Sequence, residues 1–229
     1  WTHKIQFGMR YHLDQADRFA TRSAYNMTNG TMILSAAGIK GNQENQIRNA
    51  QSLDTFLNYD ISFKRLKVSP GVRYENINFD FQNYGTADNA RLGTVLRSAE
   101  NQLTVILPGI GLHYWLNENM NLLGSIHKGF SPPGMPSVTA TSGQARMETS
   151  VNYELGYHFE KNGYTAQVVG FFNNYSNILG SDNISGGGLG TGDMFNAGNA
   201  HIRGIEISFE GNLLSNKNYP SGLSFPVSL

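Results

Sequence analysis

The chain has 229 residues, with 17 Lys and Arg against 17 Asp and Glu, no Cys, 26 Gly and 11% aromatic residues. The balanced charge argues against nucleic acid or an anionic membrane surface as a partner, and the missing Cys excludes disulfides and thiolate metal sites. No apolar run approaches the ~18 residues that a transmembrane helix needs.

Eight segments alternate apolar and polar residues with the period of two that is typical of a β-strand. In the first segment one face carries Ile5, Phe7, Met9, Tyr11 and Leu13. The other face carries Lys4, Gln6, Gly8, Arg10 and His12. We predict strands at residues 4–13, 53–63, 66–75, 106–114, 120–130, 151–159, 164–172 and 204–209. Several exceed the ~10 residues that a strand needs to cross a bilayer.

The connections between these strands are alternately short and long. The predicted tight turns are Lys64-Arg65, Asn117-Glu118-Asn119 and Glu160-Lys161-Asn162-Gly163. The predicted long loops are residues 14–46, 82–101, 131–147 and 180–193. All short turns therefore fall on one edge of a meander, as in a bacterial outer-membrane barrel with short periplasmic turns and long extracellular loops.

Two prolines, Pro70 and Pro108, lie inside predicted strands. Proline has no N–H to donate to a neighbouring strand. We therefore expect a bulge or a locally open rung at each.

Four motifs in order resemble the barrel of TonB-dependent outer-membrane receptors. They are Pro70–Glu75 (PGVRYE), Gly129–Pro133 (GFSPP), Glu148–Gly156 (ETSVNYELG), and Asn196-Ala197-Gly198 followed by Gly204-Ile205-Glu206. The resemblance covers essentially the whole chain. The segment Ile126–Pro133 (IHKGFSPP) is most similar to the ferric-citrate-type branch.

The resemblance implies a receptor that binds an iron chelate outside a Gram-negative cell. Such a receptor imports the chelate with energy from the inner-membrane TonB complex. In the family, a transmembrane barrel of about 22 strands encloses an N-terminal plug. We expect residues 1–229 to be an internal piece of that barrel, without plug or TonB-contact segment, and we expect 221–229 to begin another strand.

Candidate site residues fall into two groups. Polar residues expected on or near the lumen wall are Arg10, Arg73, Glu75, Glu154, Arg203 and Glu206. Arginines expected in or below the loops are Arg18, Arg22, Arg48, Arg91, Arg97 and Arg146, and their guanidinium groups suit a carboxylate-rich chelate such as ferric citrate. From the second group we select Arg22, Arg97 and Arg146, together with His12 and His127 of the upper wall, as ligand contacts. Solvated loop or wall residues remain the alternative for each.

No cofactor or metal ligand is predicted, because the six His residues occur singly and without Cys. Two other classes remain open. A complete eight-stranded barrel could act as an adhesin or structural anchor. A barrel enzyme would need a nucleophile and a base on adjacent strands, and the sequence suggests no such pair. We therefore predict that the protein is not an enzyme.

Overall fold

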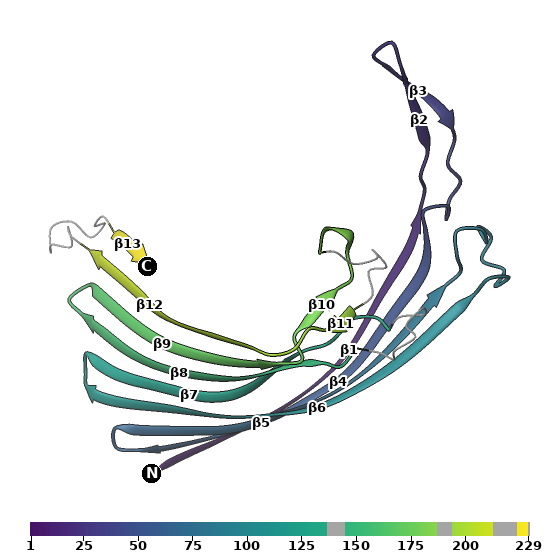
Figure 1. The fold of residues 1–229 in the computed structure, drawn as a ribbon. Helices are drawn as coiled ribbons and strands as arrows, with labels where there is room; N and C mark the ends of the chain where they lie inside the picture. Colours follow the sequence, from purple (N-terminus) through teal and green to yellow (C-terminus); the bar gives the residue numbers. More distant parts are fainter. Residues whose placement is uncertain (137–144, 187–193, 213–223, 229) are drawn as a thin grey trace.

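The computed structural model describes residues 1–136, 145–186, 194–212 and 224–228, which contain a nine-stranded antiparallel sheet. Its strand order is β1-β4-β5-β6-β7-β8-β9-β12-β13, with β1 and β13 at the two ends of a strongly curved sheet (Figure 1). The strands are β1 (Thr2–Ala20), β4 (Glu44–Phe63), β5 (Leu66–Asn83), β6 (Arg97–Asn117), β7 (Met120–Ser131), β8 (Glu148–Lys161), β9 (Tyr164–Ser176), β12 (Ala200–Asn212) and β13 (Ser224–Ser228). The prediction of an all-β antiparallel meander is confirmed, as is the start of a further strand after β12.

The three predicted tight turns are present and lie at one end of the sheet (Figure 1). The last of them is a two-residue loop between Lys161 and Tyr164. Asn162 and Gly163 there have φ values of 52° and 79°. Two successive positive φ angles are what a type I′ hairpin turn requires, and Asn-Gly is its preferred sequence.

The first four strands are longer than predicted, so the loop bounds 14–46 and 82–101 were wrong. β1 continues to Ala20 and pairs without interruption with β4, which starts at Glu44. Beyond Leu13 the outward positions become polar, so the alternation in hydropathy ends although the backbone ladder continues. Side-chain hydrogen bonds replace apolar contacts there: Gln15 Nε2 donates to Asn49 Oδ1 at 2.9 Å, and Asn49 Nδ2 donates to Asp80 Oδ1 at 3.1 Å.

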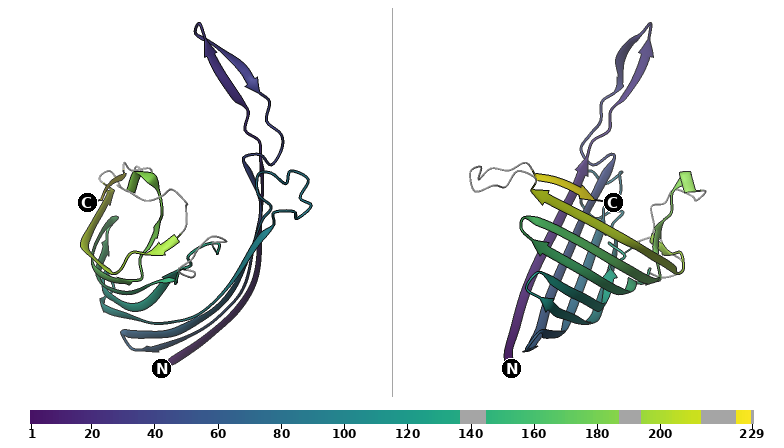
Figure 2. Two further views of the ribbon diagram at one scale, coloured as in Figure 1. Left: turned by 45° about the vertical axis from the view of Figure 1, so that its right-hand side comes forward. Right: turned by 90° about the vertical axis from the view of Figure 1, so that its left-hand side faces the viewer.

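The first long loop contains a separate hairpin of β2 (Ala24–Thr28) and β3 (Thr31–Ala36), which projects beyond the sheet (Figures 1 and 2). Asn29 and Gly30 form its turn with φ values of 51° and 79°. The loop between β9 and β12 contains the short pair β10 (Leu179–Ser181) and β11 (Met194–Asn196) and the 3₁₀ turn η1 (Ile184–Gly186). Parts of the predicted loops 131–147 and 180–193 lie outside the described residues.

The predicted open rung is present at Pro70, whereas at Pro108 the pairing with one neighbouring strand ends. Pairing of β4 with β5 runs to Asn58↔Gly71 and resumes at Ile61↔Val68, leaving an open rung at Pro70. Pairing of β6 with β7 ends at Gly109↔His127, next to Pro108. Above this point β6 is hydrogen-bonded only to β5 among the described strands.

The two faces of the sheet differ in chemistry and exposure. Aligned apolar side chains form a convex outer face, where Ile5, Phe7 and Met9 are 69 to 71% exposed. The opposite face is concave and mainly polar, and its side chains bury one another: Asp54 and Glu75 are 9% and 6% exposed. The described residues include no helix long and apolar enough to cross a membrane.

Aromatic side chains line the outer face near the short turns. Trp1 lies 4.6 Å from Phe63 between ring centroids, and Tyr164 lies 6.2 Å from Phe209. The Tyr59 hydroxyl is hydrogen-bonded to His3 Nδ1 at 2.8 Å. An aromatic band with polar atoms at its rim is typical of the boundary between lipid and water.

The loop between β5 and β6 is held in place by Arg91, which has a φ of 55°. Its guanidinium binds both carboxylate oxygens of Asp17 at 3.0 and 2.5 Å and donates from Nε to Asn45 Oδ1 at 2.8 Å. The same group stacks on the Phe19 ring at 4.2 Å. Asp88 then accepts the backbone N–H groups of residues 92–94 at 2.7 to 3.2 Å. We call Asp17, Asn45, Asp88 and Arg91 the loop clasp.

The outer face is the one that we expect to meet lipid, and Phe7 lies midway between His3 and Tyr11 on it. In the intact membrane protein that carries this chain, Phe7→Arg should lower the free energy of unfolding from liposomes by about 2–4 kcal/mol. Gln6→Arg places the same charge on the concave face of the same strand and should have a much smaller effect. Equal losses for the two variants would contradict the assignment of faces.

The clasp should be pH-sensitive through Asp88. The N–H of Leu92, followed by those of Gly93 and Thr94, lowers the pKa of Asp88 below its ordinary value of 3.8. This stabilisation is fully present above the unfolded-state pKa and is lost as pH falls through the lower folded-state pKa. Hydrogen-exchange protection factors of amides 92–94 should therefore stay constant down to about pH 4 and fall below it.

Asp88→Asn should lower the same protection factors at neutral pH and remove their pH dependence. Arg18→Ala, which breaks an exposed ion pair with Glu44 at 3.1 Å, is the control and should leave them unchanged. Unaltered protection in Asp88→Asn would show that the carboxylate does not hold the loop.

Candidate functional site

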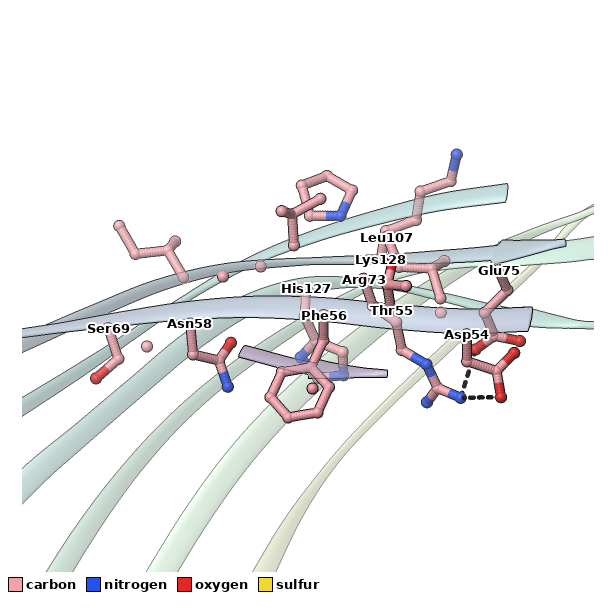
Figure 3. Close-up of a pocket in the computed structure, with 18 of the residues that line it drawn as sticks. Asp54, Thr55, Phe56, Asn58, Ser69, Arg73, Glu75, Leu107, His127 and Lys128 are labelled. Atoms are coloured by element: carbon pink, nitrogen blue, oxygen red, sulfur yellow. Dashed lines mark ion pairs between the residues drawn. The ribbon is translucent and has the colours of Figure 1, made fainter. Parts of the chain in front are cut away.

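The densest cluster of charge on the concave face surrounds two neighbouring carboxylates. Asp54 of β4 and Glu75 of β5 are directly opposite each other in register. Arg73 lies on the same face two residues before Glu75, and its Nη2 is 2.6 Å from Glu75 Oε1 and 4.0 Å from Asp54 Oδ2 (Figure 3). One guanidinium thus compensates two largely buried carboxylates, which would otherwise repel each other.

This cluster continues onto β1 and keeps unused hydrogen-bonding capacity. Arg10 pairs in register with Asp54 and is bonded through Nη2 to His12 Nδ1 at 3.0 Å. Asp54 Oδ1 is buried without a hydrogen-bond partner among the described residues. Arg10, His12 and Arg73 are all exposed. The cluster can therefore bind a further polar group on the lumen side.

A hollow of about 860 Å³ adjoins the cluster. Two side chains that line it lie directly over glycines: a Cβ at Gly8 would overlap the Phe56 ring, and one at Gly71 would overlap Asn58 Oδ1. His127 extends over Gly109, its register partner, on the same side of the sheet as Arg73 and Asp54 (Figure 3). One end of the hollow therefore carries the guanidinium of Arg73 and the carboxylates of Asp54 and Glu75. The other end carries the imidazole of His127 and the amide of Asn58.

Two other predicted wall residues, Glu154 and Glu206, lie elsewhere on the concave face. Glu154 accepts a hydrogen bond from Ser125 Oγ at 3.3 Å, and Glu206 is exposed on β12. Neither contacts the cluster around Asp54. The structure therefore brings together only Arg10, Arg73 and Glu75 of the predicted wall set.

Arg203 was assigned to the wrong face. It is the register partner of Phe172 and alternates in phase with Ile205 and Ile207, so it lies on the outer, apolar face. Its spacing from these isoleucines already indicated this position in the sequence.

The loop arginines divide into structural and free groups. Arg91 belongs to the clasp, Arg18 pairs with Glu44, and Arg48 stacks on Phe81 at 5.3 Å. The selected residues Arg22, Arg97 and Arg146 are exposed at the loop end. Asn42 and Asn196 anchor Arg22 and Arg146, respectively, through their backbones at 2.7 to 2.9 Å, which leaves both guanidinium groups available for a ligand.

Sequence reasoning missed Asp54, Asn58 and the clasp. The first two were visible as polar positions alternating with Leu53, Thr55 and Leu57, but alternation does not show which polar residues meet across strands. The clasp joins residues 74 positions apart and leaves no local signal. Within the described ranges, no three His, Cys, Asp or Glu residues are grouped so that they could hold a metal ion.

Comparison with known proteins identifies a family for this chain and several relatives. Residues 1–227 match the family model described as TonB dependent receptor-like, beta-barrel. The pesticin receptor of Yersinia enterocolitica is 25% identical over 146 residues, which is 62% of this chain and 21% of that receptor. The chain thus spans about a fifth of the length of this curated relative.

Solved structures share the fold at lower identity. The ferric yersiniabactin uptake receptor FyuA from Yersinia pestis superposes with a TM-score of 0.65 and 16% identity, covering 94% of this chain and 30% of that one. The ferric citrate transporter FecA gives a TM-score of 0.68 and 19% identity, covering 99% and 32%. The family match covers almost the whole chain and agrees with the curved sheet and its two contrasting faces. The chain therefore belongs to the β-barrel family of TonB-dependent receptors, which are outer-membrane transport receptors.

Proposed function

We propose that this chain forms part of the barrel wall of an outer-membrane receptor that binds an iron chelate and imports it with energy from TonB. The observation that carries the proposal is the family match over residues 1–227. Two relatives support an iron chelate as cargo, since their names state uptake of ferric yersiniabactin and transport of ferric citrate. The plug and the TonB contact would belong to parts of the receptor outside this chain.

Within this role, the exposed arginines at the loop end would make first contact with an anionic chelate. Arg22, Arg97 and Arg146 present guanidinium groups whose paired donors match a carboxylate. His12 and His127 lie deeper on the concave face, with Arg10 beside His12. We propose ferric citrate, a carboxylate-rich complex, as the cargo that best suits these donors.

The alternative of a complete eight-stranded barrel is not favoured. Within the described residues the sheet has nine strands, and its end strands β1 and β13 are not paired with each other. A wall that curves but does not close exposes backbone donors and acceptors at both edges, which is unfavourable in lipid. Further strands would satisfy those edges.

Removal of a chelate contact should weaken binding without unfolding the wall. In the intact receptor, Arg22→Ala, Arg97→Ala or Arg146→Ala should raise the Kd for ferric citrate about tenfold where the arginine binds a carboxylate, since a charge-assisted hydrogen bond contributes about 1.5–3 kcal/mol. Isothermal titration measures the change.

The matched control is Arg65→Ala, which removes the same charge at the opposite end of the wall. Arg65 Nη1 donates to the backbone oxygen of Leu116 in the short-turn region. Unchanged affinity in all three loop variants would refute ferric citrate as cargo. Loss of affinity in Arg65→Ala as well would show a general charge effect instead of a binding site.

The cluster around Asp54 should contribute to wall stability. Arg73→Ala leaves two facing carboxylates without their counter-ion and should destabilise the intact receptor by about 1–3 kcal/mol, a range reduced because Arg73 is half exposed. Unfolding by urea measures the loss. Adding Asp54→Asn and Glu75→Gln should restore most of it, and a failure to restore would contradict a charge-pairing role.

A further inference from the structure

Arg203 is a charged residue on the face of the sheet that meets lipid. It lies in β12 directly above Ile205, which is 71% exposed, and beside Phe172 of β9. Arginine on the lipid face of a barrel is tolerated near the membrane boundary, where the long side chain reaches the polar layer. Arg203 is the fourth residue after the loop that precedes β12, so that boundary is the loop end of the barrel.

Two further basic side chains lie on the same face and at the same end. Lys128 of β7 aligns through Val151 and Asn174 with His201 of β12. Figure 3 shows Lys128 on the opposite side of the sheet from His127 and Arg73. Three strand spacings separate Lys128 from His201, about 14 Å. His201 rests against the Phe172 ring at 5.6 Å.

The charged side chains on the outer face of β7, β8, β9 and β12 are all basic among the described residues. Among the described residues, no outward position of β7, β8, β9 or β12 carries Asp or Glu. The outward positions above the apolar band of β1, β5 and β6 instead carry Asp17, Asp80 and Glu100. The basic charge is therefore confined to one sector of the barrel.

A groove of about 730 Å³ runs beside Arg203 on this face. Its walls include the side chains of Tyr153, Leu155, Phe172 and Ile205, and Gly170 contributes no side chain. An ideal Cβ at Gly170 would have no neighbour closer than 4.0 Å, so the space above this residue is open. An apolar groove that ends at a guanidinium fits an acyl chain joined to an anionic head group.

We propose that Arg203, Lys128 and His201 bind the phosphate groups of a phosphorylated lipid of the outer leaflet, with one acyl chain in the groove over Gly170. Arginine and lysine both bind phosphate, and no outward position of these four strands carries a carboxylate to compete for them. Glu154 also borders the groove, but its side chain is on the concave face, where Ser125 donates to it. This site faces away from the lumen and does not depend on the identity of the transported chelate.

The test uses the intact receptor in nanodiscs of phosphatidylcholine containing either bis-phosphorylated lipid A or its phosphate-free counterpart. Native mass spectrometry of the released protein gives the ratio of phosphorylated to phosphate-free lipid retained. The double variant Lys128→Gln/Arg203→Gln should lower this ratio about tenfold or more. Lys161→Gln, on the same face at the short-turn end, is the matched control and should leave it unchanged.

A second variant addresses the groove without altering charge. Gly170→Leu fills open space and should reduce retention of lipid A while leaving thermal stability close to that of the wild type. An unchanged ratio in the double variant overturns the proposal, and so does an equal loss in Lys161→Gln. The double variant could also unfold more easily and yet keep the wild-type lipid ratio. That result would assign Arg203 to an ion pair within the barrel and would also overturn the proposal.

Discussion

The hydrogen-bond ladder between neighbouring strands is the constraint on which the rest of this structure depends. No water is available in the hydrocarbon core, so each backbone N–H and C=O must be bonded within the protein. A regular ladder fixes the side-chain period at two, and the period then sorts residues into a lipid face and a lumen face. The cluster around Asp54 and the hollow beside it exist because this sorting brings alternate residues of β1, β4, β5 and β6 to one side.

The alternation made the membrane-crossing parts of the strands predictable. Outside the lipid region, outward positions need not be apolar, so the alternation disappears although the strand continues. For this reason β1 and β4 extend beyond their predicted ends, through polar residues such as Gln15 and Asn49. The hairpin β2–β3 was also missed, although Asn29-Gly30 is a strong turn signal, because its strands have no buried face to impose a pattern. Local sequence cannot reveal the clasp, since Arg91 and Asp17 meet only after the sheet has formed.

The sequence predicted which side of the sheet the site residues occupy, but it did not predict which of them contact one another. The spacing of Arg10, Arg73 and Glu75 put them on the polar side, whereas their proximity depends on the register of three strands. Arg203 shows the value of applying the period strictly, because the phase set by Ile205 and Ile207 places it toward lipid. A charged residue on an otherwise apolar face is a candidate for function, and Arg203 is such a candidate for binding a lipid phosphate.

The prolines show how the wall changes character along its height. At Pro70 the ladder opens and closes again, whereas at Pro108 the pairing of β6 with β7 ends. Beyond Glu75, whose register partner is Val105, the concave face of β5 and β6 is mainly apolar: Phe79, Phe81, Leu103 and Val105 are 5 to 8% exposed. Arg48 covers Phe81 from β4. The lumen wall thus passes from a hydrated, charged surface to a packed apolar one, and this packing supports the loop end where the sheet has lost a strand neighbour.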